Sequence, residues 1–179
     1  MTAHLTGIPT LETRRLTLRG PRIEDFEAWA DFCASPRAAH IGGPLDRGTA
    51  WRAFCHSPGQ WALRGYGAFV FCLKGSDAAL GMTGPWHPAD WPERELGWTV
   101  WSDDAEGKGL AHEAAIAARR FAYDTLGWTT AVSYIEKDNT RSIALATRLG
   151  ATHDPDATAP HDNDPDTLVY RHPAPEALQ

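Results

Sequence analysis

The stretch E106-G-K-G-L-A-H-E-A-A115 is the feature that most constrains the fold, because it sets two glycines and a lysine directly before an alanine-rich run. Glycine in a helix's first turn costs roughly 1 kcal/mol relative to alanine, and no ordinary helix cap precedes the run. The first amides of a helix have no intrahelical partner and lie at the positive end of the helix dipole. A strand, this glycine loop and a helix therefore predict bare backbone N–H groups that face a phosphate.

The spacing of the glycines narrows the kind of phosphate ligand. The loop is neither G-x-x-x-x-G-K-[ST] nor G-x-G-x-x-G, which argues against a nucleoside triphosphate or a dinucleotide. A shorter phosphate-binding loop is the interpretation that we favour. The alternative is a glycine-rich turn that only leads into a core helix.

Length and composition indicate one soluble globular domain over residues 1–179. The chain has 42% hydrophobic and 22% charged residues, values typical of a folded soluble protein. Its net charge of -6 argues against a nucleic-acid partner and suits a cationic amine substrate. The N-terminus lacks an apolar h-region and no run approaches the ~18 apolar residues of a membrane span, so we expect a cytoplasmic protein without membrane association.

The three cysteines, Cys33, Cys55 and Cys72, are an odd number without C-x-x-C spacing. We therefore expect reduced, mostly buried thiols rather than a disulfide framework or a zinc site. His153, His161 and the aspartates between them also match no ligand spacing, so we expect no metal there.

Hydrophobic periodicity predicts alternating strands and helices. The expected strands are 15–19, 68–73, 79–83, 95–101, 131–135 and 168–170, with a hairpin turn at 74–77. The expected helices follow Pro21, start at Thr49, and span 110–126 and 139–149, the last two ended by Gly127 and Gly150. Strand, helix, strand, helix in the second half predicts a parallel crossover within a mixed sheet.

These segments together resemble the GCN5-related N-acetyltransferases (GNAT), and within them the RimJ/RimL-like group. The family's pyrophosphate loop, Gln/Arg-x-x-Gly-x-Gly/Ala, aligns with E106-G-K-G-L-A111. The segments L11-E-T-R-R-L-T-L-R19, E95-L-G-W98, N139-T-R-S142 and L149-G150 follow the family's order, and the resemblance covers about 10–172. It implies an α/β (α+β) GNAT fold, with a mixed, mostly antiparallel sheet of about six or seven strands flanked by about four helices.

The resemblance also implies a function. It implies an enzyme that moves an acetyl group from the cosubstrate acetyl-CoA to a primary amine, by direct attack in a ternary complex and without a metal. The acceptor is a protein N-terminus or a small-molecule amine. The residues assigned to the cofactor are Trp98, Thr99, Val100, Glu106, Gly107, Lys108, Gly109, Leu110, Ala111, Asn139, Arg141 and Ser142.

Glu106 departs from the family pattern, which has Gln or Arg at this position. A carboxylate facing a pyrophosphate would be repelled, so we expect Glu106 to point to solvent while its backbone still serves. Asp103 and Asp104 add negative charge just upstream. The alternative is that these acids only complement the helix N-terminus.

Acetyl transfer needs a neutral amine, yet an alkylamine with a pKa near ~10 is mostly protonated at pH 7. Glu95 is the candidate base, acting directly or through a water, because E95-L-G-W lies on the strand before the cofactor loop. The alternative is an ordinary strand carboxylate paired with Arg94 or another neighbour. By resemblance, a backbone N–H near Trp98 to Val100 stabilises the oxyanion, and Gly97 permits a bulge there.

The leaving coenzyme A thiolate needs a proton or a hydrogen bond. Many relatives use a tyrosine of the last helix, but Ala146 occupies that position here, and Ser142 is the RimL-like substitute. Asn139 is expected to hold the cofactor arm or a water. The competing interpretations are an N-cap for Asn139 and a first-turn polar residue for Ser142.

Four basic residues lie on the relevant segments, Lys108, Arg119, Arg141 and Arg148, and we favour Lys108 and Arg141 for phosphate contacts. Trp86 and Trp91 are candidates for the acceptor pocket, with a core or hydrophobic-staple role as the alternative. Asp90 and Glu93 beside them are expected to attract a cationic amine.

Two other functional classes are compatible with parts of the sequence. A noncatalytic acyl-CoA-binding or sensing module is favoured by Ala146 and Glu106, whereas Glu95 and Ser142 favour catalysis. A nucleotide-binding enzyme fits the loop poorly. A homodimer is one assembly that the sequence allows.

Overall fold

The computed structural model describes residues 6–160 and 164–178, which contain one eight-stranded sheet in the order β1-β2-β3-β4-β5-β6-β8-β7. The strands are β1 (Leu11–Glu12), β2 (Leu16–Arg19), β3 (Phe69–Leu73), β4 (Gly81–Trp86), β5 (Glu95–Val100), β6 (Val132–Glu136), β7 (Thr152–His153) and β8 (Thr167–Arg171). Each described pair of neighbours is antiparallel except β5 and β6, which are parallel. The mixed, mostly antiparallel sheet is thereby confirmed.

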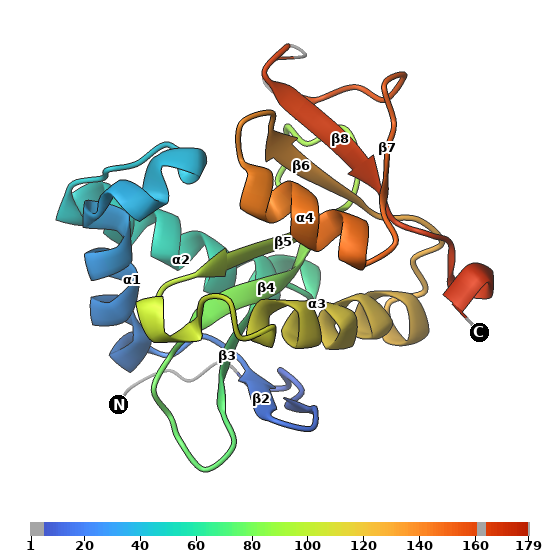
Figure 1. The fold of residues 1–179 in the computed structure, drawn as a ribbon. Coiled ribbons are helices and arrows are strands. Elements are labelled where there is room, and N and C mark those ends of the chain that lie inside the picture. The colour runs from blue at the N-terminus through green and yellow to red at the C-terminus, as the bar shows by residue number, and fades with distance from the viewer. Residues whose placement is uncertain (1–5, 161–163, 179) are drawn as a thin grey trace.

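Helices cover both faces of this sheet (Figure 1). The α-helices are α1 (Phe26–Ala34), α2 (Arg47–Arg64), α3 (Leu110–Arg120) and α4 (Thr140–Arg148), and a π-helical turn, η4 (Phe121–Thr125), continues α3. Short 3-10 turns are η1 (Ile23–Asp25), η2 (Pro36–Ile41), η3 (Asp103–Ala105) and η5 (Pro175–Leu178). In the described residues, no helix combines the length and apolarity that a membrane crossing requires.

Strand alternation explains why both faces are covered. Phe69 and Phe71 of β3 point to one face and pack with Leu16 and Leu18 against α3. Val70, between them, points to the other face and packs against α1 and α2. A strand with large apolar residues on both faces must be buried from both sides, and the two helical layers do this.

The alanine-rich composition of α3 has a packing reason. Ala114, Ala115 and Ala118 are fully buried, so small side chains let the helix lie close across β4 and β5. The helix was expected to run to Leu126, but it changes to the π-helical turn at Phe121. Gly127, with φ 66°, then ends it as predicted.

The predicted order of elements is confirmed, including the hairpin and the parallel crossover through α3. Several boundaries differ from the predicted ones, most of them by one or two residues. Asp46 accepts hydrogen bonds from Gly48 N and Thr49 N, so α2 starts at Arg47 and not at Thr49. Strand β4 extends to Trp86, and the two-residue strands β1 and β7 had no periodic signal. Cys33 and Cys72 are buried free thiols, whereas Cys55 is exposed.

Candidate functional site

The sheet opens between β5 and β6. Their only registered pair in the described chain is Glu95 with Val132, after which the two strands diverge, as Figure 1 shows beside α4. A cavity of about 610 Å³ lies at this opening. Its lining comes from η2, α2, β4, β5, β6 and the start of α4, so segments distant in the sequence meet there.

Strand β5 presents Glu95, Gly97 and Thr99 on one face, because side chains two apart share a face. A Cβ atom at Gly97 would lie 3.5 Å from Glu95 Oε1, so the glycine leaves the space beside the carboxyl group open. The expected bulge at Gly97 is wrong, because the pairing of β4 with β5 keeps one register from Gly81–Val100 to Trp86–Glu95. The opening arises from the parting of β5 and β6 instead.

Glu95 has the environment of a tuned carboxyl group. Burial raises its pKa to about 7, while a hydrogen bond from Trp91 and one from the backbone of Tyr134 oppose that rise. The indole Nε1 of Trp91 donates to Glu95 Oε2 at 2.6 Å and fixes the side chain in the cavity wall. No ion pair of Glu95 with Arg94 occurs among the described contacts, in contrast to the ordinary strand carboxylate considered above.

Backbone amides of β5 face the opening. The carbonyl of Leu96 lies toward β6, where Ser133 Oγ donates to it at 2.6 Å. Main-chain groups alternate along a strand, so the amides of Trp98 and Val100 point the same way, beyond the last pair with β6. The amide of Thr99 points to β4, whereas its side chain lines the cavity.

The glycine loop has the conformation expected of an anion-binding site. Gly107 and Gly109 both have φ 69°, and Gly109 is the N-cap residue of α3, without a side-chain cap. In the described residues, the helix ladder begins with Glu113 N donating to Gly109 O, which leaves the preceding amides of the helix start for another acceptor. A Cβ atom at Gly107 would meet nothing within 4 Å, so the loop backbone is accessible.

Glu106 was expected to point to solvent; its side chain is 36% exposed, but its carboxylate is held in ion pairs. Its carboxylate accepts from Arg37 at 2.5 Å and from Arg141 at 2.8 Å, which neutralises the charge that was expected to repel a phosphate. Arg37 also binds Asp103 and the carbonyls of Val100 and Trp101. Arg141 therefore stands beside the loop, paired with Glu106, and Lys108 is exposed on the loop itself.

The start of α4 brings Ser142 to the opening. Asn139 is the N-cap, accepting from Ser142 N at 3.1 Å, and it also lines the cavity, so its capping interpretation holds. The indole Nε1 of Trp98 donates to Ser142 Oγ at 3.2 Å, which leaves the serine proton for another acceptor. Ala146 is fully buried, next to Ile135, with no polar group to offer.

A series of buried, hydrogen-bonded side chains lies next to the opening, and the sequence did not predict it. Arg119 donates to His172 Nδ1 at 3.3 Å and to the Leu149 carbonyl at 2.5 Å. Because arginine only donates, His172 carries its proton on Nε2 and donates it to Ser133 Oγ at 2.9 Å. Arg119 is thus structural and not a phosphate ligand. No local spacing signals this series, since its members come from α3, β6 and the segment after β8.

His172 should make the protein acid-sensitive. Burial, with the charge of Arg119, lowers the pKa of His172 to about 3, below the ordinary value near 6.5. Below about pH 6.5 His172 therefore binds a proton in the unfolded chain but not in the folded one. The free energy of unfolding falls by about 1.4 kcal/mol per pH unit as the pH drops toward 3. Urea unfolding at pH 7 and pH 4.5 should show a smaller loss of unfolding free energy for His172→Gln than for the wild type. Equal losses would mean that another group carries the acid sensitivity.

The tryptophans and acids of the β4–β5 loop divide into two groups. Trp86 and Trp91 both line the cavity, and Trp86 packs against His56 at 4.6 Å between ring centroids. Glu93 forms a two-point ion pair with Arg171, and neither it nor Asp90 is part of the cavity lining, so their expected role in attracting an amine is not supported.

The metal question can be followed only for the histidines that the structure describes. His153 packs against Tyr170, and His161 lies outside the described residues. A separate group, His40 with Glu136 and Asp138, brings ligand atoms within 4.8 Å of one another. His40 Nδ1 lies 2.8 Å from Glu136 Oε2, and this contact joins η2 to β6 across the cavity.

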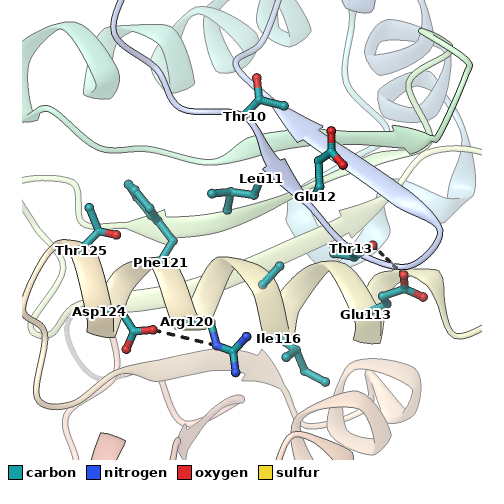
Figure 2. A pocket seen from close by; sticks show the side chains of 11 residues that line it. Thr10, Leu11, Glu12, Thr13, Glu113, Ile116, Arg120, Phe121, Asp124 and Thr125 are labelled. Carbon is teal, nitrogen blue, oxygen red and sulfur yellow. Dashed lines mark hydrogen bonds and ion pairs between the residues drawn. The ribbon is translucent and has the colours of Figure 1, made fainter.

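A second cavity, of about 520 Å³, lies between β1 and α3 (Figure 2). Thr13 and Glu113 point toward one another there at 2.6 Å. Burial acts to raise the pKa of Glu113, but hydrogen bonds from Thr13 and Arg15 lower it to about 2. Arg15, held by Glu113, donates to the Lys108 carbonyl at 3.0 Å and so anchors the glycine loop.

Comparison with known proteins finds a matching family model and similar solved structures. The family model of the GNAT acetyltransferase domain matches residues 15–152. An acetyltransferase from Agrobacterium tumefaciens is 42% identical over 97% of this chain and 99% of its own, with a TM-score of 0.86. Two structures share the fold with a TM-score of 0.70: a GNAT-family acetyltransferase from Bacillus anthracis (18% identity, 91% and 97% of the two chains) and RimL, a ribosomal L7/L12 alpha-N-protein acetyltransferase (14%, 96% and 98%). The chain therefore belongs to the GNAT family of acetyltransferases.

Proposed function

We propose that the protein transfers the acetyl group of acetyl-CoA to a primary amine by direct attack in a ternary complex. The observation that carries this proposal is the cavity at the parting of β5 and β6, where Glu95, the amides of β5 and Ser142 meet. The cosubstrate supplies an activated acetyl group. The uncapped start of α3 and the glycine loop suit its diphosphate, because unpaired amides and the helix dipole favour an anion.

Glu95 acts as the base in this proposal. With a pKa raised to about 7 by burial, it is partly ionised at neutral pH and can take a proton from the acceptor ammonium, directly or through a water. The bond from Trp91 orients the carboxyl group. The amides of Trp98 and Val100, on the open side of β5, are suited to stabilise negative charge on the acetyl oxygen.

Ser142 acts as the acid or hydrogen-bond donor toward the leaving thiolate. Its oxygen already accepts from Trp98, so its own proton is free to donate. Replacing Ser142 by alanine should lower kcat by roughly 10- to 100-fold, because one hydrogen bond to a charged group contributes about 1.5–3 kcal/mol. The affinity for acetyl-CoA should change little. Unchanged kcat in a steady-state thiol-release assay would make Ser142 only a first-turn polar residue.

The test of the proposed function is release of free thiol from acetyl-CoA in the presence of a panel of small amines and short peptides. Amine-dependent release supports acetyl transfer. Binding of acetyl-CoA without release on the whole panel supports the noncatalytic acyl-CoA-binding module instead. A calorimetric titration with acetyl-CoA in parallel separates this second result from a failure to bind the cosubstrate.

A further inference from the structure

The cavity has an uneven charge. Its lining contains three carboxyl side chains, those of Glu95, Glu136 and Asp164. Every lysine and arginine of the chain lies within the described residues, and none of them lines the cavity. Arg37 and Arg141 approach from outside the lining, but Glu106 and Asp103 hold them. A ligand in this cavity therefore meets three carboxyl groups and two imidazoles, those of His40 and His56, but no lysine or arginine.

The charge distribution discriminates between amines. An ammonium group is favoured beside these carboxyl groups, and it loses that charge only when Glu95 takes its proton. A second anionic group on the acceptor, such as the α-carboxylate of a free amino acid, would be desolvated among like charges without a counter-ion. Such a group lies only two bonds from the reacting nitrogen, so it must enter the cavity with it.

The wall also carries a group of aromatic side chains, beside polar ones such as Ser133 and Asn139. Phe54 and His56 of α2, with Trp86 and Trp91 of the β4–β5 segment, line the cavity. His56 and Trp86 pack against each other, and Trp91 packs edge-on against Tyr134 at 6.2 Å. Aromatic faces contact both flat apolar groups and ammonium ions favourably.

We propose that the acceptor is a small primary amine carried on an aromatic or similar apolar body and bearing no carboxylate. This inference rests on the proposed acetyl transfer and narrows its substrate. Free amino acids are excluded by charge, and small polar amines gain nothing from the aromatic wall.

Three matched compounds test the proposal: 2-phenylethylamine, phenylalanine amide and phenylalanine. Values of kcat/KM are compared per concentration of neutral amine, because the three amino groups differ in pKa. The amine and the amide should exceed the free acid by roughly 100-fold, the factor that corresponds to like-charge repulsion of a few kcal/mol. Ethanolamine should fall at least about 10-fold below phenylethylamine. A kcat/KM for phenylalanine within threefold of the value for its amide would overturn the proposal. Turnover of peptides with no turnover of the small amines would overturn it as well.

A variant that changes the charge of the cavity lining tests the same proposal. Glu136→Lys places a cation in the lining, at a half-exposed position at the end of β6, and should reduce the amide-to-acid ratio by at least about 5-fold. Glu24→Lys makes the same change of charge at an exposed position outside the cavity and should leave the ratio unaltered. An equal shift in both variants would assign the preference to net charge and contradict the proposed role of the lining.

Binding separates this inference from the proposed function. Isothermal titration of the protein saturated with coenzyme A should show tighter binding of the amide than of phenylalanine, even if no amine is turned over. Equal affinities overturn the acceptor assignment. The absence of thiol release with every amine, despite selective binding, would instead contradict acetyl transfer and leave the selectivity of the cavity supported.

Discussion

Replacing Glu95 by glutamine is expected to lower kcat by roughly 10²- to 10³-fold, the lower part of the range that general-base catalysis contributes. Glutamine keeps an oxygen that can accept from Trp91 Nε1, so the cavity wall should keep its shape. The affinity for acetyl-CoA should stay within about threefold of the wild type. Steady-state thiol release gives kcat, and calorimetry gives the dissociation constant.

The pH dependence identifies the cause of that loss. Because Glu95 must be ionised to act, and its pKa is raised to about 7, the ratio of wild-type to variant rates should fall as pH drops through 7. The stability effect has the opposite sign. A carboxyl group whose pKa is raised on folding destabilises the protein as pH rises from about 4.5 through 7, so Glu95→Gln should unfold at higher urea concentration at pH 8. A variant with half of wild-type kcat would make Glu95 an ordinary strand carboxylate.

Replacing Gly109 by valine is expected to weaken acetyl-CoA binding by at least about 100-fold. Gly109 has φ 69°, a left-handed conformation that costs a non-glycine residue roughly 1–3 kcal/mol and is worst for a β-branched one. Space is not the cause, since a Cβ atom there would meet only Arg15, at 3.7 Å. The strain should turn the amides at the start of α3 away from the diphosphate. Calorimetric titration with acetyl-CoA measures the loss.

Gly127 provides a matched control for this substitution. It has φ 66°, nothing lies within 4 Å of a Cβ atom built there, and it ends the same helical segment far from the loop. Gly127→Val should therefore lower stability by a similar amount while acetyl-CoA affinity stays unchanged. Equal loss of affinity in both variants would show that strain anywhere in this segment, and not the loop geometry, impairs binding.

The order of elements and the place of the site were predictable because their signals are local. Alternating apolar residues mark the central strands, and the glycines of E106-G-K-G-L-A111 precede an uncapped helix, as the structure confirms. Glu95, Ser142, Trp86 and Trp91 all line the cavity. Their proximity was predictable because each lies on β4, β5 or α4, or on the segment between β4 and β5. Their catalytic and binding roles are proposals.

The contacts that the sequence did not predict are those between residues far apart along the chain. Glu106 was expected in solvent because a pyrophosphate would repel its carboxylate, whereas its partner Arg37, which is 69 residues away, pairs with that charge. The same holds for Glu93 with Arg171 and for the series from Arg119 to His172 and Ser133. The prediction of a bulge at Gly97 was wrong for a different reason. A glycine can leave space in a cavity wall through its missing side chain, without any kink in the strand.

In the proposed function, free backbone amides at the start of α3 bind the diphosphate of acetyl-CoA. Isothermal titration with acetyl-CoA and with acetyl-pantetheine, which lacks the diphosphate and the nucleotide, measures this contribution, with 3′-dephospho-CoA as the control for the remaining phosphate. We expect acetyl-pantetheine to bind at least about 100-fold more weakly than either nucleotide-bearing ligand, since several hydrogen bonds to a charged group would be lost. Equal dissociation constants for acetyl-pantetheine and acetyl-CoA would mean that these amides bind no phosphate.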